Sequence, residues 1–277
     1  MTGTIPPEGA HSDVPPNMPD PIPVATALPQ RPPLSGSRLQ KILRLEQDRF
    51  DSARMRSGYW GPFAVVDALL KESGAVFRQV VAGQDSGLYA RSILIVSIFF
   101  TALYGLLMGM PASMKQGAYA SAKLPLVFIG TWLICLPSFY VFNSMMGSKL
   151  TLRQTCLLLL CLTGPAAILL IGFAPVVWFF GISTESGGFI AFMHVAVIGL
   201  ATMYGIASLG TARDYVAYLG DDSGAVGSSF VALWTLVYTA VLCQMCTYLG
   251  PLVTTGNFFT GKRQLFLAAM VEFLTGK

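Results

Sequence analysis

The chain has 277 residues, of which 53% are hydrophobic and only 12% charged, and its mean hydropathy is +0.60. A water-soluble domain carries about twice that charged fraction, so the composition excludes an ordinary soluble enzyme or binding domain. The formal net charge of +4 comes without a basic and aromatic platform, which argues against nucleic acid as the partner. An anionic membrane surface explains the basic residues better.

The first segment, residues 1–36, holds ten of the 17 prolines and little that a fold could bury. We predict a disordered tail that is partly polyproline II; a docking role for its proline pairs is the alternative. No secretory signal peptide is expected, because the basic start and the apolar middle are missing.

Residues 37–91 predict a cytoplasmic, basic and amphipathic helical segment. Its first part, 37–55, indicates a short charged surface helix that Ser37 can cap. Between residues 60 and 81, apolar residues recur at helical spacing and Ser73-Gly74 interrupts them, which predicts two short amphipathic helices. We expect them to lie in the bilayer interface; a small subdomain packed on itself is the alternative.

Five apolar runs reach the roughly 20 residues that a membrane span requires. The spans are predicted at Ser92–Met110, Leu124–Met146, Thr155–Phe180, Gly188–Leu209 and Ser229–Leu249. Residues 251–277 are too polar for a sixth span and are expected to form an interfacial tail. The predicted fold is an all-α, polytopic transmembrane helix bundle over residues 92–250, preceded by interfacial amphipathic helices.

Charged residues are expected only between the spans, because an ion in hydrocarbon is expensive. The spans then lack the ionisable group that an ion-coupled transporter usually keeps. Twelve Lys and Arg residues lie on the side of the N-terminus and five on the other, so the N-terminus is predicted to be cytoplasmic and the C-terminus outside.

The polar side chains within the spans indicate contacts between helices more than a catalytic or binding role. Asn143 and His194 are the side chains that stand out, and each is expected to hydrogen-bond a neighbouring helix. The prolines Pro137, Pro165 and Pro175 are expected to kink their helices, which can fit helices together or open a gate. Ala201-x-x-x-Gly205 is a small-residue pair that favours close helix packing, either within the bundle or in an oligomer.

Enzyme signatures are absent from the sequence: no nucleophile–base pair, no metal-ligand set and no phosphate-binding loop is present. The five cysteines all lie in apolar segments, and Cys243-x-x-Cys246 has no second pair to complete a metal site. We predict no enzyme activity, no cofactor and no metal.

One stretch resembles a known family. It runs from Leu136-Pro137 to Asn143, continues through Met146-Gly147-Ser148-Lys149 and ends at Arg153-Gln154-Thr155. With Gly164-Pro165-Ala166 and the upstream run 76–80, this stretch resembles the segment that joins the second and third spans of Yip1-like bacterial multi-span membrane proteins. The resemblance implies five spans, a cytoplasmic N-terminus, a bacterial inner membrane and no catalytic residues. It adds Gly147, Arg153 and Gln154 to the candidate structural or gating positions.

Two functions fit this sequence. The first is a non-enzymatic membrane scaffold or accessory subunit that acts through anionic lipid headgroups and membrane-protein partners, or as a homo-oligomer. The second is a channel or permease subunit for a neutral or lipid-like solute, with the proline-containing second and third spans lining the path.

Overall fold

The computed structural model describes residues 40, 43–45, 53–56, 61–82, 85–145, 150–219 and 228–250. Every regular element in these ranges is helical, as predicted. The short elements are α2 (Ala53–Arg56), η1 (Gly61–Phe63), α3 (Ala64–Lys71) and α4 (Ser73–Ala82); the long ones are α5 (Ser86–Gly109), α6 (Met114–Met145), α7 (Leu152–Ser183), α8 (Gly187–Leu219) and α9 (Ser228–Leu249). The tail predicted at 1–36, most of the surface helix at 37–55, the turn with Gly147 and the segment 251–277 lie outside the described residues.

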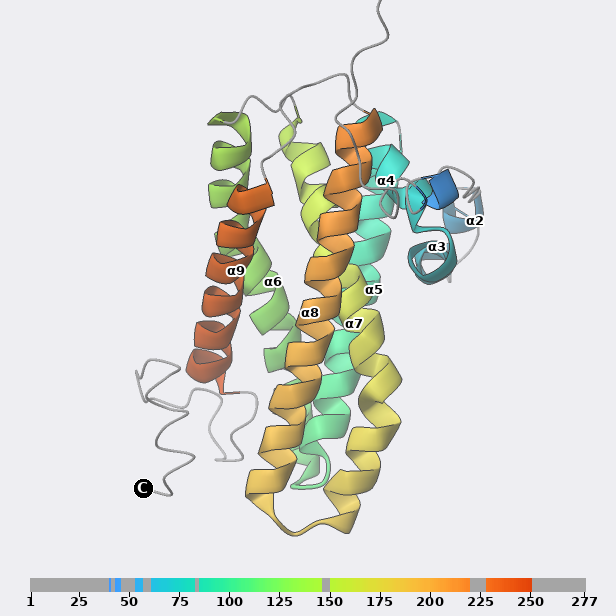
Figure 1. Cartoon of the computed structure of the whole chain (residues 1–277). Coiled ribbons are helices and arrows are strands. Elements are labelled where there is room, and N and C mark those ends of the chain that lie inside the picture. Colours follow the sequence, from blue (N-terminus) through green and yellow to red (C-terminus); the bar gives the residue numbers. More distant parts are fainter. Residues whose placement is uncertain are drawn as a thin grey trace, which may run out of the picture. The chain divides into compact units, whose positions relative to one another are not determined.

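The five helices α5 to α9 are each long and apolar enough to cross a membrane. They alternate in direction, so that α5 runs away from the end that carries α3 and α4, and α9 finishes at the opposite end (Figure 1). The five-span prediction is confirmed, and the chain is an integral, multi-pass membrane protein.

The long helices extend beyond the apolar runs that predicted them, and this corrects two expectations. Residues 114–123 belong to α6 and residues 211–219 to α8, where the sequence predicted loops. Lys123 therefore lies inside the helix that carries the second span, directly before the apolar run Leu124–Met146, and its side chain is buried. The cause is that hydropathy detects the part of a helix that faces hydrocarbon, whereas backbone hydrogen bonding continues past that boundary.

Glycines set the closest approaches between the spans. A Cβ atom at Gly109 of α5 would lie 2.6 Å from the carbonyl oxygen of Gln116 in α6, and Gly105 sits equally tightly against Ala120. On the other side of the bundle, Gly205 of α8 lies directly against the backbone of Leu162 in α7. The small-residue pair Ala201-x-x-x-Gly205 thus serves packing within the bundle.

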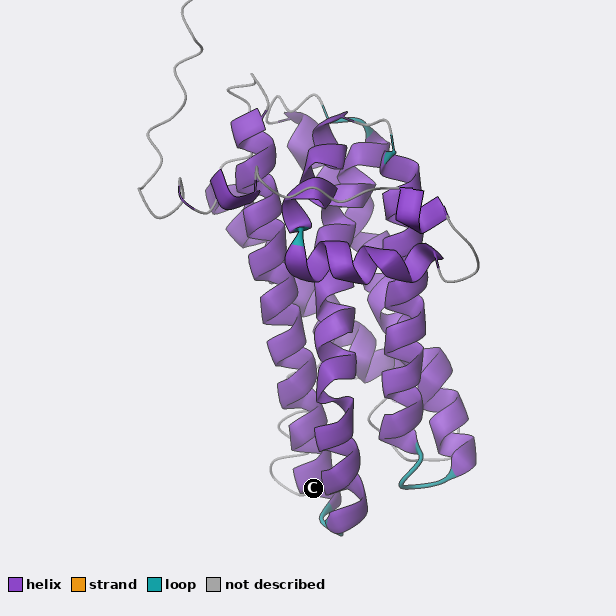
Figure 2. Ribbon diagram, turned by 90° about the vertical axis from the view of Figure 1, so that its right-hand side faces the viewer, coloured by secondary structure: helices purple, strands orange, loops and turns teal. Residues whose placement is uncertain are grey.

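The two amphipathic helices predicted before the first span are present as α3 and α4. Helix α3 lies roughly perpendicular to the spans and across their side (Figure 2). Their apolar faces are not turned to lipid, however. Val76, Phe77 and Val80 of α4 are almost fully buried in one cluster with residues of the bundle.

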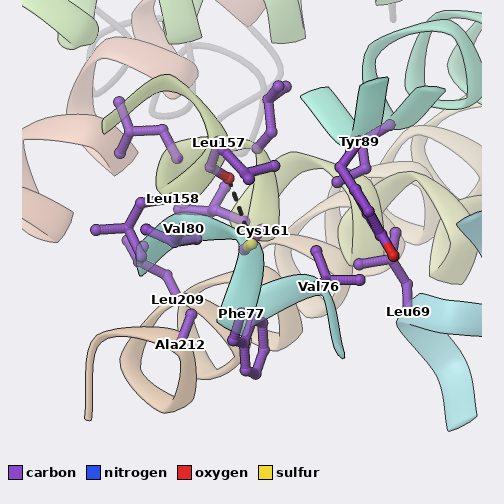
Figure 3. Close-up of a cluster of buried hydrophobic side chains, with 14 of the residues drawn as sticks. Leu69, Val76, Phe77, Val80, Tyr89, Leu157, Leu158, Cys161, Leu209 and Ala212 are labelled. Atoms are coloured by element: carbon purple, nitrogen blue, oxygen red, sulfur yellow. Dashed lines mark hydrogen bonds between the residues drawn. The ribbon is translucent and has the colours of Figure 1, made fainter. Parts of the chain in front are cut away.

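Figure 3 shows this cluster at the level where α4 meets the spans. The residues labelled there come from the short helices and from α5, α7 and α8: Leu69, Val76, Phe77, Val80, Tyr89, Leu157, Leu158, Cys161, Leu209 and Ala212. The apolar face of an amphipathic helix has to pack against another apolar surface. Here that surface is provided by α7 and α8 and not by lipid. The short helices are consequently part of the bundle's core and not a separate subdomain.

Candidate functional site

The candidate site is the end of the bundle at which α3 and α4 dock, because most of the charged side chains in the described residues gather there. Helix α4 is fixed to α8 by Arg78, whose guanidinium donates to the Tyr215 hydroxyl at 3.3 Å and to the Leu45 carbonyl at 3.2 Å. The ring of Phe77 packs against that of Tyr215, with centroids 6.3 Å apart. This polar and aromatic contact orients α4 on the bundle.

The outer side of α3 carries a small ion-pair network. Asp67 accepts from Lys71 at 2.8 Å and lies 3.7 Å from Arg54. The hydrogen bond and the charge of Lys71 lower the pKa of Asp67, and the same hydrogen bond raises the pKa of Lys71. The side chains of Lys71 and Asp67 are 74% and 45% exposed, so the pairing shapes the surface more than it stabilises the fold.

Two further ion pairs occupy the same end. Arg56 of α2 pairs with Asp85, the residue before α5, across 29 residues of chain. Arg213 pairs with its neighbour Asp214 on α8, with Nε 3.0 Å from the carboxylate oxygen. Four of the six arginines between residues 53 and 219 are therefore engaged, namely Arg54, Arg56, Arg78 and Arg213.

The remaining two arginines, Arg91 and Arg153, flank the first turn of α5. Both side chains are exposed. A Cβ atom at Gly87 would lie 3.8 Å from Cζ of Arg153, an ordinary van der Waals contact, so the Arg153 guanidinium lies beside the start of α5. The sequence analysis had selected Arg153 but not Gly87 or Arg91. The pattern that could have identified them is a glycine four residues before an arginine, with the arginine directly before the apolar run.

Gln154 has a structural explanation. Thr151 accepts from the backbone N–H of Gln154 at 3.4 Å, and the Gln154 side chain accepts from the backbone N–H of Thr151 at 2.8 Å. This reciprocal pair is a capping box that begins α7. The pattern Thr-x-x-Gln was visible in the sequence, and it accounts for part of the turn that resembled the Yip1-like segment.

The other predicted positions are distributed along the spans. Asn143 is buried near the end of α6, at the same end of the bundle as Arg153 and Gln154. Pro165 is buried in α7 beside Gly164, whose missing side chain leaves room for Ile93 and Leu69. Pro137 and Pro175 are exposed on α6 and α7, and both helices continue through their prolines.

A small cavity of about 10 Å³ lies between α5, α6 and α7, which is room for about one water molecule. The residues that line it are mainly apolar with three hydroxyls among them: Leu94, Ser97, Thr101, Phe128, Ile129, Trp132, Leu160 and Thr163. The indole N–H of Trp132 is buried and has no hydrogen-bond partner.

Towards the opposite end of the bundle, His194 of α8 makes the interhelical hydrogen bond that the sequence predicted. Its Nδ1 lies 3.2 Å from the hydroxyl of Tyr104 in α5, and both side chains are buried. Across the described residues, no three His, Cys, Asp or Glu side chains come close enough together to hold a metal ion.

The chain was also compared with known proteins. No family model, no curated protein and no solved structure matches it.

Proposed function

We propose that this protein is a non-enzymatic membrane scaffold or accessory subunit, and that it acts through the end of the bundle formed by α3 and α4. The observation that carries the proposal is the packing of these two helices against the bundle. The apolar faces of both helices pack against the bundle, and the exposed charges of Asp67 and Lys71 lie on the outer side of α3.

Helix α3 offers a surface that a partner can contact. Leu70 is 56% exposed next to the paired charges of Asp67 and Lys71. The helix lies across the spans, as helices at the membrane surface do (Figure 2). We propose that this end faces the cytoplasm of a bacterial cell, in accord with the Lys and Arg count, and that the outer side of α3 meets lipid headgroups and a membrane-protein partner.

The proposal also includes a distant relation to Yip1-like membrane proteins. It is supported by the five spans, by the turn region before α7 and by an amphipathic lead-in that contains the run 76–80. The capping box of Thr151 and Gln154 supplies a physical reason for part of that likeness.

Site-specific photocrosslinking on the full-length chain tests the scaffold function. A photoreactive residue at Leu70 should yield a discrete crosslink to a membrane protein or to an anionic lipid in native membranes. The matched control is Leu133, which is 58% exposed on α6 and lies within a span, where zwitterionic and anionic lipids should be captured alike. Equal products from both positions would contradict the proposal.

The rival function is a channel or permease subunit for a neutral solute, and the cavity at Trp132 is the feature that favours it. Its volume admits one water molecule, and two of the three predicted gating prolines are exposed on the outside of their helices. Solute flux through reconstituted protein that is lost in Trp132→Phe and kept in Trp178→Phe, outside the cavity, would replace the scaffold proposal.

A further inference from the structure

Arg91 and Arg153 differ from the other arginines at their end of the bundle. Within the described residues neither makes an ion pair or a side-chain hydrogen bond, whereas Arg54, Arg56, Arg78 and Arg213 all do. The acidic residue closest in sequence, Asp85, is already bound to Arg56. The two guanidinium groups are thus available at the surface.

Gly87 lies beside one of these groups and one helical turn before the other. A Cβ atom added at Gly87 would lie 3.8 Å from Cζ of Arg153, an ordinary van der Waals contact, so the guanidinium lies beside the start of α5 with room for a Cβ atom between them. Arg91 follows one helical turn later on the same face of α5, about 5–6 Å along the helix. Because side chains on a helix lean toward its N-terminus, Arg91 extends over the turn that contains Gly87. A larger residue at position 87 would occupy the space in front of the Arg153 guanidinium.

The position along the spans selects the kind of ligand. Arg91 directly precedes the apolar run of α5, and Arg153 stands two residues before that of α7. Both therefore lie at the boundary between hydrocarbon and headgroups, where long cationic side chains reach toward phosphates. Guanidinium groups match phosphate oxygens in geometry as well as charge.

We propose that Arg91 and Arg153, with the space at Gly87, form a binding site for the phosphate of an anionic lipid headgroup. This inference rests on the proposed function only in requiring that this end of the bundle faces an anionic leaflet. It assigns a specific headgroup site to the α5–α7 junction, away from the outer side of α3.

Lipid retention by the purified full-length protein tests the site. The protein is extracted in mild detergent with equal amounts of phosphatidylglycerol and phosphatidylcholine, and the bound lipids are counted by native mass spectrometry. The wild type should retain phosphatidylglycerol preferentially. Arg91→Gln and Arg153→Gln should each lower that retention about five-fold, the effect of one cationic side chain near a membrane surface.

The matched control is Lys115→Gln, which removes an exposed cation at the opposite end of the bundle, in the first turn of α6, and should leave retention unchanged. Gly87→Leu keeps both charges and fills the space in front of the Arg153 guanidinium, so it should also weaken retention. Unchanged retention in both Arg91→Gln and Arg153→Gln would overturn the site. Release of the lipid by millimolar inorganic phosphate would show that the site takes a free anion, and would overturn the lipid assignment.

The lipid experiment and the crosslink at Leu70 fail independently. Arginine-dependent retention without a crosslink from Leu70 would remove the scaffold function and keep the site. A crosslink from Leu70, together with lipid retention that is the same in both arginine variants as in the wild type, would remove the site and keep the scaffold function.

Discussion

The buried Lys123 of α6 donates a hydrogen bond from Nζ to the carbonyl oxygen of Gly250, 3.5 Å away, and Gly250 is the first residue after α9. Gly250 has a φ of 52°, the left-handed conformation that ends many helices, and its N–H bonds to the carbonyl of Cys246 at 3.0 Å. A cation beside the C-terminus of a helix is also favoured by the helix dipole. The pair fixes the end of α9 against α6.

This arrangement predicts that Gly250→Ala destabilises the protein by about 1 kcal/mol, because a side chain is strained at that φ. Denaturation in detergent, followed by circular dichroism, measures the change. Gly172→Ala is the control, since Gly172 is helical with nothing within 4 Å of a Cβ atom there. Equal losses in the two variants would contradict the explanation.

The α5–α6 crossing is expected to reject larger residues. Gly105→Val places methyl groups against the backbone of α6 at Ala120 and should cost about 1–3 kcal/mol, the usual penalty for overpacking. Thermal unfolding of the detergent-solubilised protein is the measurement. Gly172→Val, with the same change in volume on an open surface, should cost much less; comparable midpoints for the two would refute the crossing geometry.

The buried pair of Tyr104 and His194 should show a measurable coupling. Hydrogen bonds between spans are worth about 0.6 kcal/mol on average, so Tyr104→Phe is expected to lose an amount of that order. A double-mutant cycle with His194→Leu isolates the interaction. Strict additivity of the two changes would mean that the hydrogen bond contributes nothing.

The start of α7 depends on its capping box. Thr151→Ala removes the acceptor for the Gln154 N–H and should destabilise the protein by about 1 kcal/mol. Ser183→Ala, which removes an exposed hydroxyl that bonds only to its own helix, is the matched control. A thermal melt of each variant measures the change. A midpoint for Thr151→Ala that is no lower than that for Ser183→Ala would contradict the role of the capping box.

Gly199 separates packing within the bundle from packing between copies. A Cβ atom there has no neighbour within 4 Å among the described residues. A Cβ atom at Gly205, further along α8, would instead meet the backbone of Leu162. Gly199→Leu should therefore leave the stability of a monomer unchanged. A large loss, together with a smaller particle in size-exclusion chromatography, would show that another copy packs on this face and support the homo-oligomer.

The sequence predicted the five spans and the two short helices because both rest on local patterns, namely apolar length and helical spacing. It did not predict that α4 would bury Val76, Phe77 and Val80 against α7 and α8. A periodic stripe shows which face of a helix is apolar and carries no information on what covers it. The same limit applies to Lys123, whose burial follows from the place where α9 ends and not from its own neighbours in sequence.

The candidate site was predictable only in part. Asn143 was selected as a polar residue within a span, and Arg153 and Gln154 from a resemblance; the structure places all three at one end of the bundle. Gly87 and Arg91 belong to α5, more than 60 residues from Arg153, and only the packing of α5 on α7 brings them together. Contacts between distant segments of this kind leave no mark in a single sequence.

The attachment of α9 has a consequence for how the protein is made. This helix touches α6 above all and α8 to a lesser extent, whereas α5 packs extensively on both α6 and α7, and α7 packs extensively on α8 (Figure 1). Once residue 219 has left the ribosome, the first four spans and the short helices have all of their mutual contacts within reach. The fifth span can then join a unit whose other helices already have their partners, by packing along α6.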